Sequence, residues 1–246
     1  MRIPRIYLPL DLIVKQTFEL TDHAFQHTVK VLRMKQDAKL VLFDGKGNEY
    51  SAVLQQVNKK NAFVNIEKKL NTDTESNLSI HLGLGISKGD RMDFAIQKAV
   101  ELGVTEITPL FTEHCVVNLD EKRIQKRLQH WQGVIVSACE QSGRSVLPAL
   151  NNIIKLNKWS DAIDNTCFVL DPLATTTLNQ VQVTPRNSNI SLVIGPEGGL
   201  SSDEILQLKK KEHFHAVKFG PRILRTETAT LSVITAIQLL WGDLLK

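Results

Sequence analysis

Apolar and polar residues follow two different patterns along the chain, and the change falls within the polar stretch 68–77. Before it, two short apolar-rich runs flank Asp44-Gly45-Lys46-Gly47-Asn48, which predicts a β-hairpin. Short strands with a single helix, capped by Thr21 or Asp22, favour a small β-barrel. The expected elements are a helix over 21–31 and strands over 39–43, 49–57 and 62–66.

After residue 77 the pattern changes to alternating strands and helices. Because 68–77 has no apolar period, it is typical of a linker, and we place the domains at 1–73 and 74–246. The alternation predicts a mostly parallel sheet covered by helices on both faces. The expected strands are 79–86, 106–111, 167–171, 191–194 and 215–219, and the expected helices are 91–102, 120–141, one ending at 159–163, 202–212 and 226–241.

Two helix patterns carry further information. Ser201 and Glu204 have the spacing of a capping box, which predicts a helix start directly after a glycine-rich loop. The final helix is apolar around most of its circumference, from Ala229 to Trp241. Such a helix is buried on several sides, which fits a deep core, a subunit interface, or both.

Composition narrows the class of protein. With 42% hydrophobic and 23% charged residues, the chain has the make-up of a soluble globular protein. It has no apolar run long enough for a membrane span and no secretory signal pattern, so we expect a cytoplasmic protein without a membrane partner. Cys115, Cys139 and Cys167 are far apart, which predicts buried free thiols. Neither these cysteines nor the scattered histidines have the spacing of a metal site or a Ser-His-Asp triad.

The excess positive charge of the chain lies in its first part. Residues 1–73 contain 12 Lys and Arg against 8 Asp and Glu, whereas residues 74–246 contain 18 of each. This bias fits a module that holds a polyanion such as nucleic acid, although ordinary surface lysines would give the same count.

Two glycine-containing loops each follow an apolar strand and precede a helix. Both should therefore lie at the carboxyl edge of the sheet, where ligands bind in open α/β folds. Gly195-Pro196-Glu197-Gly198-Gly199 matches neither a dinucleotide fingerprint nor a Walker A loop, so a phosphate cradle is not indicated. A structural turn and a ligand loop both fit this segment, and the second loop, from Phe219 to Pro221, makes a pocket the favoured interpretation.

Charged residues gather where the second loop meets the final helix. Glu227 in the first turn is favourable to the helix dipole and could be structural, whereas cations are unfavourable there. Arg222 and Arg225 therefore fit an anionic ligand or a developing negative charge. Two further polar clusters, Lys88 to Arg91 and Glu140 to Arg144, fit either a solvated face or an RNA-contacting rim.

Six segments, in order and over nearly the full length, match a known family: 2–5, 27–34, 97–104, 140–144, 195–200 and 220–229. On these segments the chain resembles the RsmE family of small-subunit ribosomal RNA methyltransferases, which belong to the SPOUT class. The resemblance implies an N-terminal PUA-like β-barrel domain that binds RNA. It also implies a C-terminal SPOUT α/β-knot domain with a trefoil-knotted, mostly parallel sheet.

The resemblance further implies a homodimer that uses S-adenosylmethionine to methylate uridine N3 in 16S ribosomal RNA, as naked RNA or within the small ribosomal subunit. One position departs from the family pattern, because His114 stands where the family usually carries arginine after Glu113. The cofactor is expected between the loops that follow three strands. The expected cofactor-binding residues are Leu170, Ile194, Gly195, Gly198, Phe219, Gly220, Ile223, Leu224 and Thr228.

The target chemistry suggests roles for three charged residues. Uracil N3 must lose its imide proton before it can attack a methyl sulfonium, and a cation near the carbonyl oxygens would stabilise the anion. Arg225 is our candidate for that cation, while Glu197 or Glu227 could accept the proton or orient the arginine. RNA phosphates are expected to contact Arg2, Arg5, Lys30, Arg33, Lys35, Lys88, Arg91 and Arg144.

Two other functions remain in competition. The chain could be a non-catalytic RNA-binding or ribosome-assembly protein that keeps the fold, although both glycine loops and Arg225 argue against this. It could also be a SPOUT enzyme for another RNA, such as a tRNA ribose 2′-O-methyltransferase. Two features argue against this alternative: the N-terminal module and the segment Arg225-Thr226-Glu227-Thr228-Ala229.

Overall fold

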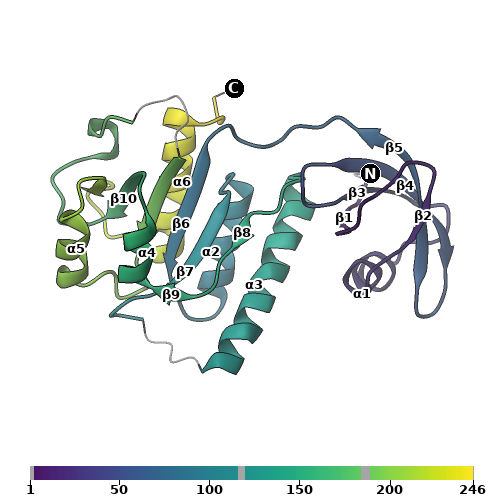
Figure 1. Ribbon diagram of the computed structural model, residues 1–246, viewed down its shortest axis with the longest axis horizontal. Coiled ribbons are helices and arrows are strands. Elements are labelled where there is room, and N and C mark those ends of the chain that lie inside the picture. Colours follow the sequence, from purple (N-terminus) through teal and green to yellow (C-terminus); the bar gives the residue numbers. More distant parts are fainter. Residues whose placement is uncertain (1–2, 116–119, 184–188, 246) are drawn as a thin grey trace. The chain divides into compact units, whose positions relative to one another are not determined.

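The computed structural model describes residues 3–115, 120–183 and 189–245 (Figure 1). Contacts divide the chain into two compact units. The first contains Met1–Glu75 together with Val136–Leu147, and the second contains Ser76–Ile135 and Pro148–Lys246. The sequence suggested a division after residue 73, but it gave no sign that a later segment returns to the first unit.

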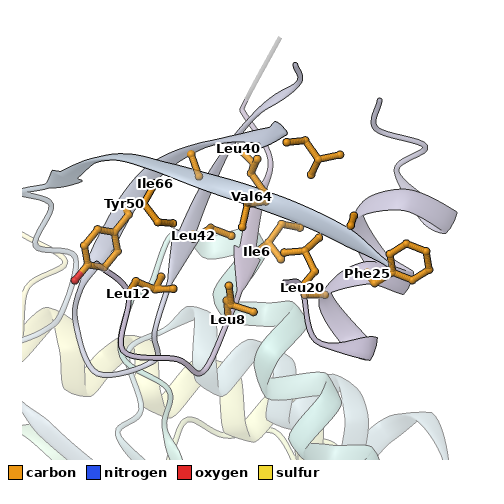
Figure 2. Packing of buried hydrophobic residues seen from close by; sticks show 14 residues of the cluster. Ile6, Leu8, Leu12, Leu20, Phe25, Leu40, Leu42, Tyr50, Val64 and Ile66 are labelled. Atoms are coloured by element: carbon orange, nitrogen blue, oxygen red, sulfur yellow. The ribbon is translucent and has the colours of Figure 1, made fainter. Parts of the chain in front are cut away.

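A five-stranded sheet forms the first unit, in the order β1-β3-β4-β5-β2. Its strands are β1 (Arg5–Tyr7), β2 (Thr17–Glu19), β3 (Lys39–Phe43), β4 (Glu49–Val57) and β5 (Ala62–Leu70). The predicted hairpin is confirmed, because β3 and β4 pair antiparallel up to Phe43 opposite Glu49. Figure 2 shows that apolar side chains from several strands gather in one core, among them Ile6, Leu42 and Val64, each fully buried.

The helical segment of this unit differs in detail from the prediction. Thr21 caps α1 (Asp22–Phe25), accepting a hydrogen bond from the backbone N–H of Ala24 at 3.4 Å. The chain then continues from Gln26 to Val31 as a π-helix. The wider turn of a π-helix is not encoded by apolar spacing, so the sequence predicted one continuous helix.

The second unit is built on a parallel sheet with the strand order β12-β10-β11-β6-β7-β8, and β9 also pairs with β7. The strands are β6 (Ser79–Gly85), β7 (Glu106–Phe111), β8 (Ala149–Leu150), β9 (Ile154–Lys155), β10 (Thr166–Leu170), β11 (Asn189–Ile194) and β12 (Phe214–Val217). The helices are α2 (Asp90–Glu101), α3 (Glu121–Ser142), α4 (Leu156–Ala162), α5 (Ser202–Lys209) and α6 (Thr226–Trp241), and the residues of α3 from Val136 onward belong to the first unit. The expected parallel α/β architecture is confirmed. The trefoil knot stays a prediction.

Helices cover both faces of this sheet (Figure 1). On one face α4 and α5 bury Trp159 and Leu208 against Val169 and Val193. On the other face α2 packs beside α6, and the Trp241 ring stacks on Phe168 with centroids 5.6 Å apart. Because successive strand residues point to opposite faces, the mostly apolar β10 and β11 are those expected of a sheet buried on both sides.

The predicted capping box at the start of α5 is confirmed in this unit. The Ser201 hydroxyl accepts a hydrogen bond from the Glu204 backbone N–H at 3.2 Å, and the Glu204 carboxylate accepts one from the Ser201 N–H at 2.8 Å. This capping box fixes the start of α5 directly after the glycine loop. The prediction of three buried free thiols holds for Cys139 and Cys167, whereas Cys115 is a free thiol that is only partly buried.

Candidate active site

Three loops enclose a cavity of about 430 Å³ at the carboxyl ends of β10, β11 and β12. The lining comes from the loop after Leu170, the glycine loop 195–199, the loop after Phe219 and the first turn of α6. This volume lies within the range of small-molecule sites, and the position is the edge at which α/β sheets bind ligands. The pocket predicted from the two glycine-containing loops is therefore present, and its third wall is the loop after Leu170, as the family resemblance implied.

The glycine loop is folded tightly on itself. The backbone N–H of Gly199 donates to the Pro196 carbonyl at 2.8 Å. A Cβ on Gly195 would lie 2.7 Å from the carbonyl carbon of Gly199 and 2.8 Å from the nitrogen of Leu200, and both are backbone atoms. Only glycine fits that position without a shift of the loop. The Thr226 hydroxyl, in the first turn of α6, donates to the Gly195 carbonyl at 3.2 Å and fixes the loop from the other side.

The loop after β12 is held beside the loop after β10. The backbone N–H of Lys218 donates to the Thr176 carbonyl at 2.8 Å, and that of Asp171 donates to the Val217 carbonyl at 3.1 Å. Gly220 has a φ of +74°, and a Cβ there would project into open space. The backbone at this point is therefore free of side-chain cover and accessible to a ligand.

Eight of the nine expected cofactor residues line the cavity: Leu170, Ile194, Gly195, Gly198, Phe219, Gly220, Ile223 and Leu224. Thr228 does not line it, and its side chain is exposed. Thr226 and Ala229 face the cavity instead, because successive helix residues point in different directions and these two lie on the cavity side of α6. Asp171 also lines the cavity and was missed, although its place directly after a strand was a usable signal.

Glu197 is engaged with the segment that begins α2. Its carboxylate accepts a hydrogen bond from the backbone N–H of Lys88 at 3.0 Å and lies 3.5 Å from the Arg91 guanidinium. Burial raises the pKa of this carboxyl, but backbone hydrogen bonds, the Arg91 charge and the Ser87 hydroxyl outweigh burial and leave the pKa below its ordinary value. A carboxylate that is stabilised in this way is a weak proton acceptor.

The other two candidate catalytic residues differ in exposure. Arg225 immediately precedes α6 as its N-cap, is exposed, and does not line the cavity. Glu227 is half-buried, and its Oε2 atom has no hydrogen-bond partner among the described residues. Arg222 lines the cavity, as its place in the second loop suggested.

His114 contacts the glycine loop directly. Its Nδ1 atom lies 2.9 Å from the Gly198 carbonyl oxygen, and a Cβ on Gly198 would come within 2.9 Å of the His114 Cβ. The backbone N–H of the preceding Glu113 donates to the Glu204 carboxylate at 2.8 Å, which ties the same segment to the start of α5. The residue at position 114 thus supports the shape of the glycine loop.

The expected RNA contacts fall into two groups. Arg2 lies outside the described residues. Five of the expected RNA-contacting side chains are exposed: Lys30, Arg33, Lys35, Lys88 and Arg91. Arg5 is mostly buried and forms an ion pair with Glu49, while its Nη2 atom donates to the Arg144 carbonyl at 3.0 Å.

The structure contradicts an exposed, RNA-facing position for Arg144. Its side chain is only 4% exposed, and its guanidinium donates to the Glu75 carboxylate from Nη2 at 2.6 Å and from Nε at 3.0 Å. Glu75 also accepts a hydrogen bond from the Val146 backbone N–H at 3.3 Å. Arg144 therefore fastens the returning segment Val136–Leu147 to the first unit, and a buried, paired guanidinium is not free to meet a phosphate.

Known protein families account for both units. The model of an RNA methyltransferase domain matches residues 74–238, and that of an RNA methyltransferase PUA domain matches residues 20–67. Ribosomal RNA small subunit methyltransferase E of Buchnera aphidicola subsp. Schizaphis graminum is 40% identical, over 99% of this chain and 98% of that protein. The protein of the same name from Bacillus subtilis is 30% identical, over 92% and 93%.

Solved structures of similar proteins match this chain over nearly its whole length. Ribosomal RNA small subunit methyltransferase E from Neisseria gonorrhoeae, bound to S-adenosyl methionine, gives a TM-score of 0.91 at 42% identity and covers 99% of this chain and 100% of that one. A putative methyltransferase from Legionella pneumophila, in complex with the bound cofactor, gives a TM-score of 0.95 at 39% identity with the same coverage. With its SPOUT-type α/β domain and PUA-like N-terminal domain, the chain belongs to the ribosomal RNA small subunit methyltransferase E family.

Proposed function

We propose that this chain transfers the methyl group of S-adenosylmethionine to uridine N3 of 16S ribosomal RNA. The observation that carries the proposal is the cavity walled by the three loops after β10, β11 and β12. Two full-length relatives at about 40% identity were crystallised with that cofactor, and curated relatives carry the name of a small-subunit ribosomal RNA methyltransferase.

The residues present fit the cofactor. The cavity offers apolar side chains such as Leu170, Ile194 and Leu224 for the adenine, and exposed backbone at Gly220 for polar groups. Such a combination of apolar walls and a few backbone donors and acceptors is typical of cofactor sites. The bound cofactor would supply an electrophilic methyl group on a positively charged sulfur. The protein's part is to hold it and to exclude water from its reactive side.

The remaining chemistry requires a deprotonated uracil. In our proposal Arg225 stands outside the cofactor cavity, at its rim, and stabilises the negative charge that develops on the uracil carbonyl oxygens. Glu227 is the better candidate for proton acceptor or for orienting Arg225, because one of its oxygens is buried without a hydrogen-bond partner in the part of the chain that the structure describes. Glu197 is better suited to hold the Lys88–Arg91 segment, since its pKa is lowered and its oxygens are already engaged.

We also propose that the protein works in the cytoplasm as a homodimer. Several large apolar side chains near the C-terminus are exposed in the single chain, which supports a subunit interface there. They are Leu239 at 42%, Leu240 at 49%, Leu244 at 46% and Leu245 at 79% exposure. No helix among the described residues is long and apolar enough to cross a membrane. Sedimentation of the wild type and of a Leu240→Asp variant tests the interface, with a shift to monomer as the expected result.

Turnover of the purified protein tests the catalytic roles. At saturating cofactor and RNA, Arg225→Ala should lose methyl transfer while it keeps cofactor affinity, because the side chain lies outside the cavity. Arg225→Ala with near wild-type turnover would show that the assigned role is wrong. Lys209→Ala, which removes an exposed cation at the end of α5, is the matched control and should leave both quantities unchanged.

A further inference from the structure

The first half of α3 carries a band of positive charge in the second unit. Lys122, Arg123 and Lys126 are exposed, and Arg127 is partly exposed. At 100° per residue these four side chains, together with His130, fall within about 140° of the helix circumference. Glu121 lies outside this sector. Trp131 and Ile135, which are almost completely buried, mark the opposite, core-facing side of the helix.

Among the described residues, carboxylates pair with only one of the four cations of this band. Asp120 lies 3.5 Å from Arg123, and Asp93 lies 2.6 Å from His130, so each already has its own partner. Among the described residues, no carboxylate lies within 4.0 Å of the charged groups of Lys122, Lys126 or Arg127. Three cations therefore face solvent unpaired on a single helix surface.

The placement of two of these cations is unfavourable for the helix itself. The first turn of a helix carries partial positive charge, so Lys122 and Arg123, which lie in the first turn of α3, each cost about 0.3–1 kcal/mol. Lys126 and Arg127 lie in the next turn, on the same side of the helix. The arrangement therefore indicates that the band serves a ligand with negative charge.

Contacts connect the band to the rim of the cavity. His130 binds Asp93 one turn into α2, which places α3 beside α2 (Figure 1). Arg91, in the first turn of α2, lies 3.5 Å from Glu197 of the glycine loop. The band, the exposed cations Lys88 and Arg91, and the cavity thus follow one another along the second unit.

We propose that the α3 band, formed by Lys122, Arg123, Lys126 and Arg127, binds the sugar-phosphate backbone of the substrate RNA beside the methyl-transfer site. The proposal deepens the proposed function and rests on it for the identity of the polyanion. It extends the RNA-holding surface of the second unit beyond the expected contacts Lys88 and Arg91.

The test compares two triple variants with equal loss of charge. Lys122→Gln/Lys126→Gln/Arg127→Gln removes the three unpaired cations of the α3 band. Lys158→Gln/Lys209→Gln/Lys210→Gln removes three exposed cations from α4, from the end of α5 and from the residue that caps α5, on the other face of the sheet. Binding of the full chain to a labelled transcript of small-subunit ribosomal RNA is measured at several salt concentrations. The α3 variant should bind about tenfold or more weakly, with a log–log salt slope smaller by about 2 to 3. The control should match the wild type.

Stability and cofactor binding complete the test. The α3 variant should keep its cofactor affinity, and its Tm should stay equal to or exceed that of the wild type, because Lys122 no longer places a charge in the first turn of the helix and Lys126 and Arg127 have no carboxylate partner to lose among the described residues. A charge-preserving Lys122→Arg/Lys126→Arg variant of the wild type should bind the RNA as tightly as the wild type does. An unchanged salt slope in the α3 variant, or equal losses in both triple variants, would overturn the proposal. Since RNA binding is measured apart from methyl transfer, failure of the proposed function would show separately as absent turnover in the wild type.

Discussion

Replacement of Gly195 by alanine probes the tight glycine loop most directly. The new Cβ would lie 2.7 Å and 2.8 Å from backbone atoms of Gly199 and Leu200, so the loop must move by about 1 Å to restore normal contacts. Overpacking of this kind costs about 1–3 kcal/mol. If the cost falls on the cofactor-binding form of the loop, affinity for S-adenosylmethionine should drop by about five- to 150-fold.

Gly133→Ala is the matched control. Gly133 lies within α3, and a Cβ there would meet no atom within 4 Å. Alanine is favoured over glycine in a helix by about 1 kcal/mol, so this variant should raise Tm by about 2–4 °C. Its cofactor affinity should stay at the wild-type value. Calorimetric titration of both variants decides the matter, and a Gly195→Ala protein that binds the cofactor within twofold of wild type would refute the reasoning.

Three further predictions concern stability. Arg144→Gln should lower the free energy of unfolding by about 3 kcal/mol in urea titrations, because Glu75 loses its buried partner, whereas Lys35→Gln should change it little. Thr226→Val should lower the free energy of unfolding by about 1 kcal/mol, because the hydrogen bond to the Gly195 carbonyl is lost, whereas Thr226→Ser keeps the hydroxyl and should not. Equal Tm values for the two variants would contradict this prediction. The lowered pKa of Glu197 contributes stability above its ordinary value of 4.5, which is lost as pH falls through the lower folded value. Acid titrations of Glu197→Gln should therefore be shallower than those of the wild type.

Local sequence patterns predicted the parts of the fold that local interactions determine. The capping box at Ser201 and the two loops at the ends of apolar strands follow from residues close together in the chain. By contrast, β8 and β9 contain two residues each, which is too short for a strand to show its period of two.

Long-range partners explain the errors in the site prediction. Arg144 follows the end of α3 in a polar cluster and has the pattern of a surface cation, but its partner Glu75 comes from 69 residues earlier in the chain. The α3 band was not predicted from the sequence, for a different reason. Residues 74–246 contain equal numbers of acidic and basic residues. Such a count does not show on which side of a helix each charge lies, so it does not reveal the cations that gather on one side of α3.

Nucleoside mass spectrometry of 16S ribosomal RNA tests the central claim most directly. RNA is compared from cells that lack the protein, from cells that carry it, and from cells that carry Arg225→Ala. The account predicts that 3-methyluridine is absent without the protein, restored by the wild type and not restored by the variant. Wild-type levels of 3-methyluridine without the protein, or a different modified nucleoside that depends on it, would contradict the account.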